Sequence, residues 1–287
     1  MKGMADDSVD LVVASPPYES ARKYGELNFS LSGQEWVDWA VERYLECVRI
    51  SKGLVAWVVE GRTRKFQWSA TPALLMADLH RAGVKLRKPP IYARVGIPGS
   101  GGPDYWRNDY ELIVCASKGK LPWSDNCATG KPCKFAPGGQ MSYRTSNDSR
   151  VSKMRENATE PKAVAYLEGK LPPGAKLHTK SDGTRKRVQC YVPPAVANPG
   201  NIINCVVGGG RMGSPLAHAN EAPFPESLVE PFIKCFCPPD GIVLDCFCGS
   251  GTTLAVAERL GRKAIGIDIR PSQVELTERR IGQAATT

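Results

Sequence analysis

The sequence predicts an α/β fold in which helices cover both faces of a mostly parallel sheet. Short apolar runs typical of buried strands alternate with amphipathic helical patterns, and a glycine turn near the C-terminus joins a strand directly to a helix. The chain has 287 residues, of which 42% are hydrophobic and 23% are charged. This composition suffices for one large domain, or for one domain with a sizeable insertion.

The first part of the chain contains most of the predicted strands. Residues 8–15 (SVDLVVAS) are predicted to form a buried strand, and residues 53–60 (GLVAWVVE) form a continuous apolar run, which is typical of an interior strand. Four further elements complete this part: strands over 91–97 and 110–117, a helix over 34–50 with apolar residues every three to four positions, and a helix over 71–82 with Pro72 in its first turn. The alternation of strands and helices indicates parallel neighbours in the sheet.

Residues 118–200 show little periodicity, and Pro, Gly, Ser, Asn and Lys dominate them. The net charge of the chain is +9, and residues 118–190 alone hold 15 Lys and Arg against 6 Asp and Glu, which equals the whole excess. A local basic excess suggests a polyanionic partner, most simply nucleic acid. A solvated insertion without a ligand has the same composition, and charge alone does not separate the two.

The C-terminal part is predicted to form a helix over 226–237, a strand, turn and helix over 241–261, a strand over 263–269 and a helix from 271 through 280. In the turn DCFCGSGTT, the backbone N–H groups at the helix start point out of the sheet. No Lys follows Gly251, which excludes a P-loop. The dinucleotide pattern GxGxxG is also absent, because only Gly249 and Gly251 are present.

Two aspartates end the strands on either side of this turn. Asp245 can meet a cationic amine, and Asp268 stands where a carboxylate can accept both hydroxyls of a ribose. An amine, a carboxylate at a helix N-terminus and a ribose together describe S-adenosylmethionine. The alternative is a plain tight turn with a strand-terminal aspartate as a helix cap.

Near the other end of the chain, two prolines stop a buried strand in VVASPPYES, residues 12–20. Pro16 and Pro17 lack N–H donors and hold the chain extended, which leaves the carbonyl of Ser15 or Pro16 free to point out of the sheet. The Ser15 hydroxyl can donate or accept, and the ring of Tyr18 offers a flat face for stacking. These residues predict a pocket for an exocyclic amine and its aromatic ring; the alternative is a plain turn.

Taken in order, these segments resemble the amino-group DNA methyltransferases of the permuted β class. The matching pieces are SVDLVVASPPY, HANEAPFPESL at 218–228, DCFCGSGTT at 245–253 and GRKAIGIDI at 261–269. The resemblance implies a Rossmann-like S-adenosylmethionine-dependent methyltransferase fold with a sheet of the seven-stranded type. It also implies a catalytic half over 1–117, a basic target-recognition insertion over 118–200, and a cofactor-binding half of the same domain over 201–287.

The resemblance assigns catalysis to Ser15, Pro16, Pro17 and Tyr18. It assigns binding of the cofactor, S-adenosylmethionine, to Phe224, Pro225, Asp245, Phe247, Cys248, Gly249, Ser250, Gly251, Thr252 and Asp268. No metal is expected, because the ten cysteines show no spacing typical of a metal site. Family members usually carry a further Gly-Asp strand and helix segment upstream of SVD, and this sequence starts almost at that point, so we expect part of the wall around the cofactor adenine to be missing or rebuilt.

The implied reaction is methyl transfer to the amine of a base flipped out of double-stranded DNA. Ser15 before PPY resembles the cytosine-N4 branch, which favours N4 of cytosine over the main alternative, N6 of adenine. Cytosine-C5 transfer would need a thiolate such as Cys133, which lies far from any predicted strand end. A non-catalytic DNA-binding relic is the remaining class. His80, His178 and His218 are scattered, so we expect no general base.

The chain contains no apolar run of the length that a membrane span needs, and its N-terminus lacks the apolar stretch of a secretory signal. We therefore expect a cytoplasmic protein with reduced cysteines and no membrane partner. The resemblance leaves open whether the protein forms a homodimer and whether a cognate restriction endonuclease accompanies it.

Overall fold

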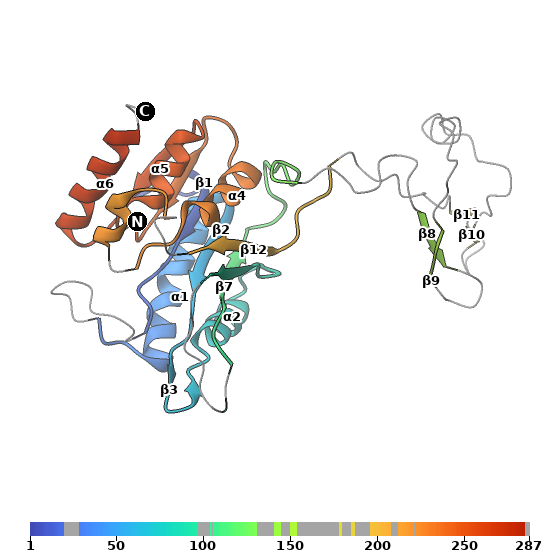
Figure 1. Ribbon diagram of the computed structural model, residues 1–287, viewed down its shortest axis with the longest axis horizontal. Coiled ribbons are helices and arrows are strands. Elements are labelled where there is room, and N and C mark those ends of the chain that lie inside the picture. The colour runs from blue at the N-terminus through green and yellow to red at the C-terminus, as the bar shows by residue number, and fades with distance from the viewer. Residues whose placement is uncertain are drawn as a thin grey trace. The chain divides into compact units, whose positions relative to one another are not determined.

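The computed structural model describes residues 1–19, 29–96, 104, 106–130, 141–144, 150–153, 178–179, 185–186, 196–207, 212–220 and 222–284. Contacts within the chain divide it into two compact units (Figure 1). The first unit consists of Met1–Thr129 and Gly200–Thr287, and the second consists of Gly130–Pro199.

A mostly parallel sheet forms the centre of the first unit. Its strands follow the order β12 (Ile202–Val206), β6 (Ile91–Val95), β7 (Tyr110–Ala116), β2 (Ser51–Val59), β1 (Val9–Ala14), β13 (Ile242–Asp245) and β14 (Lys263–Gly266), and β5 (Leu86–Arg87) pairs with β7. Among these described strands β7 alone is reversed, since it pairs antiparallel with β2, β6 and β5. In contrast, β1 pairs parallel with both β2 and β13. The predicted α/β fold class is confirmed.

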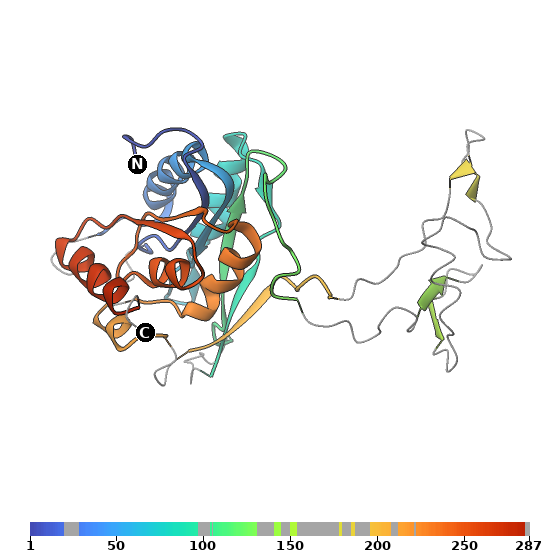
Figure 2. The same ribbon diagram turned by 90° about the horizontal axis from the view of Figure 1, so that it is seen from above.

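Helices cover both faces of this sheet. They are α1 (Gly33–Ile50), α2 (Thr71–Arg81), α4 (Glu226–Phe236), α5 (Thr252–Arg259) and α6 (Pro271–Ala284). Trp36 of α1 and Leu79 of α2 belong to the apolar cluster on one face, whereas Phe232 of α4 and Val256 of α5 belong to the cluster on the other. Figure 2 shows α1 on one side of the sheet and the orange and red helices on the other. The strands of the sheet centre are apolar throughout because both of their faces are buried.

The pairing of β1 with β2 contains a β-bulge. The pairing register shifts between Val9 and Leu11, so that Asp10 alone faces two residues of β2, one of which is Gly53. The Asp10 carboxylate accepts the N–H of Ile242 at 2.9 Å, which also ties this bulge to β13. A Cβ atom at Gly53 would lie 1.9 Å from the Asp10 carbonyl oxygen, so the backbones approach too closely for any side chain at this position.

The sequence patterns did not predict two strands of the sheet, β5 and β12, or one hairpin of the first unit. β12 pairs parallel with β6 at the sheet edge, although its exposed residues break the apolar run that predicts a buried strand. The hairpin of β3 (Thr63–Arg64) and β4 (Gln67–Trp68) follows β2, and its strands are too short for any periodicity.

The second unit contains two short hairpins within the window expected to be irregular. They are β8 (Met141–Arg144) with β9 (Arg150–Lys153), and β10 (His178–Thr179) with β11 (Arg185–Lys186). Strands of this length do not produce a recognisable alternation. The division of the chain at 118 and 200, and the target-recognition role of the segment between them, stay predictions.

Across the residues that the structure describes, no helix combines the length and the apolar character required to cross a membrane. The same residues contain no group of three or more His, Cys, Asp or Glu side chains that could hold a metal ion.

The close approach at the bulge leads to a stability prediction. We expect Gly53→Ala to lower the free energy of unfolding by about 3 kcal/mol, since the new methyl group collides with backbone that cannot swing aside. Chemical denaturation followed by circular dichroism measures the change. Gly119→Ala is the control, because a Cβ there meets nothing within 4 Å, and it should change stability little. A loss no larger than that of the control would contradict the packing of β1 on β2.

Candidate active site

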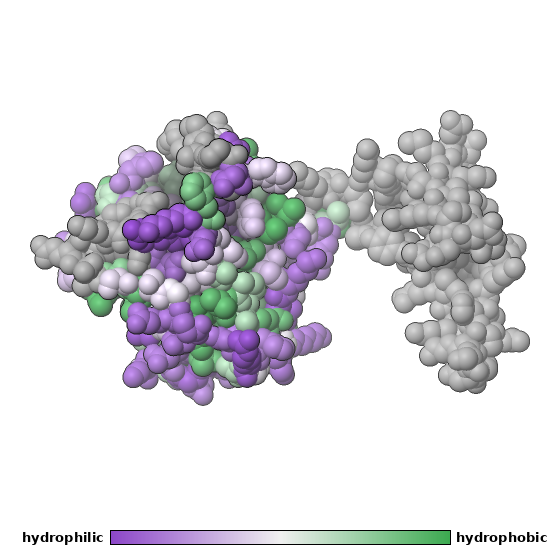
Figure 3. All heavy atoms as spheres, turned by 90° about the horizontal axis from the view of Figure 1, so that it is seen from below, coloured by the Kyte–Doolittle hydropathy of each residue, from purple (hydrophilic) through white to green (hydrophobic). Residues whose placement is uncertain are grey.

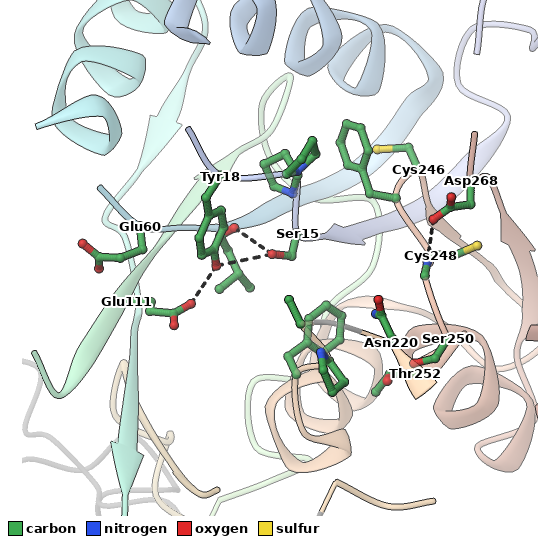
Figure 4. A pocket seen from close by; sticks show the side chains of 18 of the residues that line it. Ser15, Tyr18, Glu60, Glu111, Asn220, Cys246, Cys248, Ser250, Thr252 and Asp268 are labelled. Atoms are coloured by element: carbon green, nitrogen blue, oxygen red, sulfur yellow. Dashed lines mark hydrogen bonds between the residues drawn. The ribbon is translucent and has the colours of Figure 1, made fainter. Parts of the chain in front are cut away.

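A cavity of about 1130 Å³ opens at the edge of the sheet where the parallel strands end. Its lining includes all four residues predicted to be catalytic, Ser15, Pro16, Pro17 and Tyr18, and seven of the residues predicted to bind the cofactor, Phe224, Phe247, Cys248, Gly249, Ser250, Thr252 and Asp268. Figure 4 shows Ser15 and Tyr18 on one side, with the residues of the glycine turn on the other. The two halves of the predicted site therefore meet in one cavity.

The bend after β1 is held by α1 and β2. The indole N–H of Trp36 donates to the Pro17 carbonyl at 2.8 Å, which fixes the second proline. The Ser15 hydroxyl lies 3.3 Å from both the Val58 carbonyl and the Tyr18 hydroxyl and can donate to either. The carbonyl of Pro16 accepts no hydrogen bond from the described residues, as expected for a group left free to meet a ligand.

The ring of Tyr18 is oriented by an ion pair that the sequence did not reveal. Its hydroxyl donates to Glu111 Oε2 at 2.7 Å (Figure 4). Arg94 Nη1 lies 3.2 Å from Glu111 Oε1. Glu111 is only 9% exposed and comes from β7, whereas Arg94 comes from β6. Two strands, β6 and β7, therefore fix the phenol of Tyr18, which follows β1. A glutamate at the start of an otherwise apolar strand was the only sequence signal.

A second buried carboxylate, Glu19, fixes the chain on the far side of the bend. Its Oε2 accepts the N–H of Gly33 at 2.9 Å, at the first turn of α1, and its Oε1 accepts the N–H of Arg62 at 3.2 Å. A negative charge at a helix N-terminus is stabilising because it faces the unpaired N–H groups of the first turn. The bend is thus tied both to α1 and to the segment that follows β2.

Acidic groups gather at the wall of the cavity nearest Tyr18. Glu60 lines the cavity, and its pKa is raised chiefly by burial and further by the charge of Glu111. Burial and the same glutamate also raise the pKa of Tyr92, another lining residue. This wall therefore disfavours additional negative charge and suits a ligand that donates hydrogen bonds.

The glycine turn requires its glycines. Gly249 has φ of 50° and Gly251 has φ of 76°, both in the left-handed region that favours glycine. A Cβ at Gly249 would lie 2.5 Å from Asn220 Nδ2, and a Cβ at Gly251 would lie 2.8 Å from Thr277. The Gly249 N–H donates to Asp268 Oδ2 at 3.0 Å, so this aspartate holds the turn from the next strand end.

Asp245 occupies a position different from the one expected of it. The carboxyl group is 1% exposed and does not line the cavity; Oδ1 accepts the N–H of Phe247 at 3.0 Å, and Oδ2 accepts the Thr253 hydroxyl at 2.6 Å. Burial raises its pKa to about 7. In this arrangement Asp245 braces the turn against α5 rather than facing an amine. Gly251 and Pro225 also lie outside the lining of the cavity.

The wall beside the turn has the composition that a nucleoside needs. Phe224 and Phe247 offer ring faces, and Asp268 offers a carboxylate. The Ser250 hydroxyl is buried at the lining and has no hydrogen-bond partner among the described residues, which leaves a polar atom for a ligand. Phe29 and Trp39 close the same cavity from the first half of the chain. These residues fit S-adenosylmethionine, and the volume leaves room for a second ligand beside it.

The chain is similar in sequence to several curated DNA methyltransferases. It is 46% identical over 294 residues to the Type II methyltransferase M.PvuII of Proteus hauseri, covering 96% of this chain and 78% of that protein. Against the Type II methyltransferase M.ScaI of Streptomyces caespitosus it is 38% identical, covering 98% and 77%. Against the DNA adenine methyltransferase YhdJ of Escherichia coli it is 24% identical, covering 99% and 80%.

Two solved structures share the fold. The PvuII DNA methyltransferase, named as cytosine-N4-specific, superposes with a TM-score of 0.61 at 18% identity, covering 99% of this chain and 86% of that one. A DNA modification methylase of Thermus thermophilus, named as putative and complexed with S-adenosyl-L-methionine, gives a TM-score of 0.54 at 20% identity, covering 99% and 90%. At these identities the likeness concerns the fold.

The buried carboxyl of Asp245 leads to a prediction on pH. Its pKa is raised to about 7 from an ordinary 3.8, so the folded chain keeps a proton that the unfolded chain releases between these values. Its contribution to stability is therefore present below about pH 4 and is lost as the pH rises to about 7. Between about pH 4 and pH 7 we expect the free energy of unfolding of the wild type to fall relative to that of Asp245→Asn. Above this window the two free energies should change with pH in the same way. Denaturation midpoints measured from pH 4 to pH 8 provide the comparison, and parallel curves throughout would contradict the raised pKa.

Family membership follows from a match over almost the whole chain. The sequence model of the N6/N4 methyltransferases, described as DNA methylase, matches residues 9–279. The match includes both the bend after β1 and the glycine turn, whose residues line one cavity. The chain belongs to this DNA methylase family, in agreement with the amino-group DNA methyltransferases that its motifs resemble.

Proposed function

We propose that the chain transfers a methyl group from S-adenosylmethionine to N4 of a cytosine flipped out of double-stranded DNA. The observation that carries the proposal is the meeting, in one cavity, of the glycine turn with the bend formed by residues 15–18 after β1, here called the SPPY bend. The cofactor is S-adenosylmethionine, which supplies an electrophilic methyl group when bound. Such an enzyme would act in the cytoplasm, where the chromosome of a bacterial cell lies.

The chemical task of the SPPY bend is to improve a weak nucleophile. The lone pair of an exocyclic amine is conjugated into its ring, so little of its electron density is available to attack the methyl group. The Pro16 carbonyl and the Ser15 hydroxyl would accept the two N–H groups and turn the lone pair away from the ring. Tyr18, held by Glu111, would stack on the base and fix its plane. The nitrogen would then form its bond to the methyl carbon as the bond from that carbon to sulfur breaks, which leaves S-adenosylhomocysteine, and the methylated nitrogen would release one proton to solvent. Orientation and fixed dipoles make this possible without a strong base.

The flipped base must leave the duplex first, which costs a few kcal/mol. Contacts between DNA phosphates and the basic segment 118–200 would offset that cost and would make binding sensitive to salt. The role of this segment in target recognition is part of the proposal.

Ser15 supports cytosine N4 because its hydroxyl can serve both the amine and the ring N3, whereas an acid or amide acceptor suits the amine of adenine. A relative named as cytosine-N4-specific and one named as an adenine methyltransferase both resemble this chain, so adenine N6 is the second candidate. Cys133, the thiol considered for C5 transfer, lies outside the described residues.

A radiolabel experiment tests the reaction. Labelled S-adenosylmethionine and genomic DNA are incubated with the protein, and the DNA is digested to nucleosides for chromatography and mass spectrometry. We expect N4-methylcytosine. N6-methyladenine would establish the alternative base, and DNA binding without any transfer would establish a non-catalytic relic.

Two partners complete the proposal. M.PvuII and M.ScaI are named as Type II methyltransferases, which supports a cognate restriction endonuclease for this chain. A homodimer is the other proposed partnership. Light scattering after size-exclusion chromatography measures whether the chain forms a homodimer. Sequencing the neighbouring genes shows whether one of them encodes a restriction endonuclease.

Substitutions on the two sides of the cavity should have different kinetic effects. We expect Tyr18→Ala to lower kcat about 100-fold through loss of base positioning, with cofactor affinity nearly unchanged. Tyr18→Phe keeps the ring but loses its hydrogen bond to Glu111, so it should lower kcat less than Tyr18→Ala does. Asp268→Ala should instead raise the Kd for S-adenosylmethionine about tenfold, because a charged acceptor is lost and Gly249 is released. Calorimetry and single-turnover kinetics separate the effects, and equal losses of rate and affinity in either alanine variant would overturn this assignment.

A further inference from the structure

A short hairpin stands at the rim of the cavity. We call residues 62–68 the rim hairpin; it contains β3 and β4 and follows the carboxyl end of β2. Its first residue, Arg62, lines the cavity together with Glu60 and Gly61. In Figure 1, β3 lies at the lower edge of the first unit, beyond the ends of the parallel strands. A ligand that reaches the side of the cavity formed by Glu60, Gly61 and Arg62 therefore lies close to the rim hairpin.

The base of the rim hairpin is firmly anchored. The N–H of Arg62 lies within hydrogen-bond distance of both Glu19 Oε1 and the Ser69 hydroxyl, and the Ser69 N–H donates to the Arg62 carbonyl at 3.0 Å. The indole N–H of Trp68 donates to Glu60 Oε1 at 3.0 Å. The hairpin is therefore attached to the same carboxylate, Glu19, that fixes the SPPY bend.

The tip of the rim hairpin carries backbone strain. Pairing of Thr63 with Trp68 and of Arg64 with Gln67 leaves a loop of two residues, Lys65 and Phe66. Their φ angles are 49° and 63°, and a two-residue turn with both residues in this region favours Asn and Gly. A lysine and a phenylalanine are costly at these positions. Strain retained beside a binding site points to a function for the side chains that cause it.

The rim hairpin exposes Arg64, Lys65, Phe66 and Trp68 together with the neutral Thr63 and Gln67, whereas Arg62 is half-buried. Arg62, Arg64 and Lys65 carry positive charge, and residues 61–69 include no acidic residue. Phe66 is 70% exposed and Trp68 is 46% exposed, although both are large and apolar. Figure 3 looks onto this edge of the first unit, where hydrophobic residues lie among strongly hydrophilic ones. Basic side chains bind phosphates and aromatic rings stack on bases, so this combination fits a nucleic acid strand.

We propose that the rim hairpin grips the DNA strand beside the flipped nucleotide. Arg64 and Lys65 bind the flanking phosphates, and Phe66 stacks on a base that loses its neighbour when the target leaves the duplex. This inference rests on the proposed function, because it takes DNA as the substrate that enters the cavity. It adds a contact within the catalytic half of the chain, separate from the basic segment 118–200.

The charge of the hairpin is tested by the salt dependence of DNA binding. Arg64→Gln with Lys65→Gln removes two positive charges. The control pair, Lys85→Gln with Lys88→Gln, removes the same number of charges away from the cavity. Ser117, which follows the end of β7, donates its N–H to the Lys85 carbonyl. Because β7 is reversed, its end lies at the edge of the sheet opposite the cavity. Fluorescence anisotropy with a labelled duplex from 50 to 200 mM salt gives the slope of log affinity against log salt. We expect the hairpin pair to reduce that slope by about 2 and the control pair to leave it unchanged.

The stacking role is tested with a substitution that relieves strain. Phe66→Gly should raise the melting temperature, because glycine adopts the left-handed turn freely, and yet should lower methyl transfer to genomic DNA about tenfold. Phe66→Tyr keeps an aromatic ring and should retain the wild-type rate. Leu45→Ala, at another exposed apolar side chain, should alter neither the rate nor DNA affinity. A purely structural role for Phe66 would not combine higher stability with slower transfer.

Each outcome decides between the two proposals. Equal salt slopes for the hairpin pair and the control pair, together with wild-type transfer by Phe66→Gly, overturn the hairpin proposal even if the wild type methylates DNA. If the wild type transfers no methyl group, the proposed function fails, while the salt slopes still decide whether the hairpin holds DNA. Affinity for S-adenosylmethionine, measured in every variant, should stay at the wild-type value, since the substitutions leave the glycine turn untouched.

Discussion

The parallel pairing of β1 with both β2 and β13 is the constraint on which the site depends. It places a strand from the start of the chain beside a strand more than 200 residues later, with their carboxyl ends at one edge of the sheet. The SPPY bend continues from β1 and the glycine turn continues from β13, so the register of two ladders brings the two motifs into one cavity. Asp10 reinforces this register, since its carboxylate binds the first N–H of β13.

Buried carboxylates then fix the positions of Tyr18, the SPPY bend and the glycine turn, which strand pairing alone does not determine. Glu111 orients Tyr18, Glu19 joins the bend to α1, and Asp245 braces the glycine turn against α5. Each carboxylate accepts hydrogen bonds from neighbours that come from other elements, and buried polar groups of this kind are stable only when they are paired. The site is therefore held by polar contacts between elements, inside a frame made by apolar packing on both faces of the sheet.

The same arrangement separates two tasks within one cavity. The side formed by the glycine turn presents ring faces, Asp268 and a serine hydroxyl that has no partner within the described part of the chain, which suits a nucleoside with an amino acid tail. The side formed by the bend presents the Pro16 carbonyl, which accepts no hydrogen bond from any described residue, a hydroxyl and a fixed tyrosine ring, which suits a planar base with an amine. The rim hairpin stands next to the second side, where a strand of DNA would have to approach. Membership in the DNA methylase family agrees with this division.

The sequence by itself determined the α/β class, the helices and most strands of the sheet, because apolar periodicity records which faces are buried. It also determined the two motifs, since prolines and glycines restrict the backbone locally. Only the tertiary structure decided the rest. The partners of Tyr18 come from β7 and β6, the edge strand β12 is exposed, and Asp245 turns inward to Phe247 and Thr253 instead of facing the cavity. These features depend on which residues distant in the chain become neighbours, and no local pattern records that.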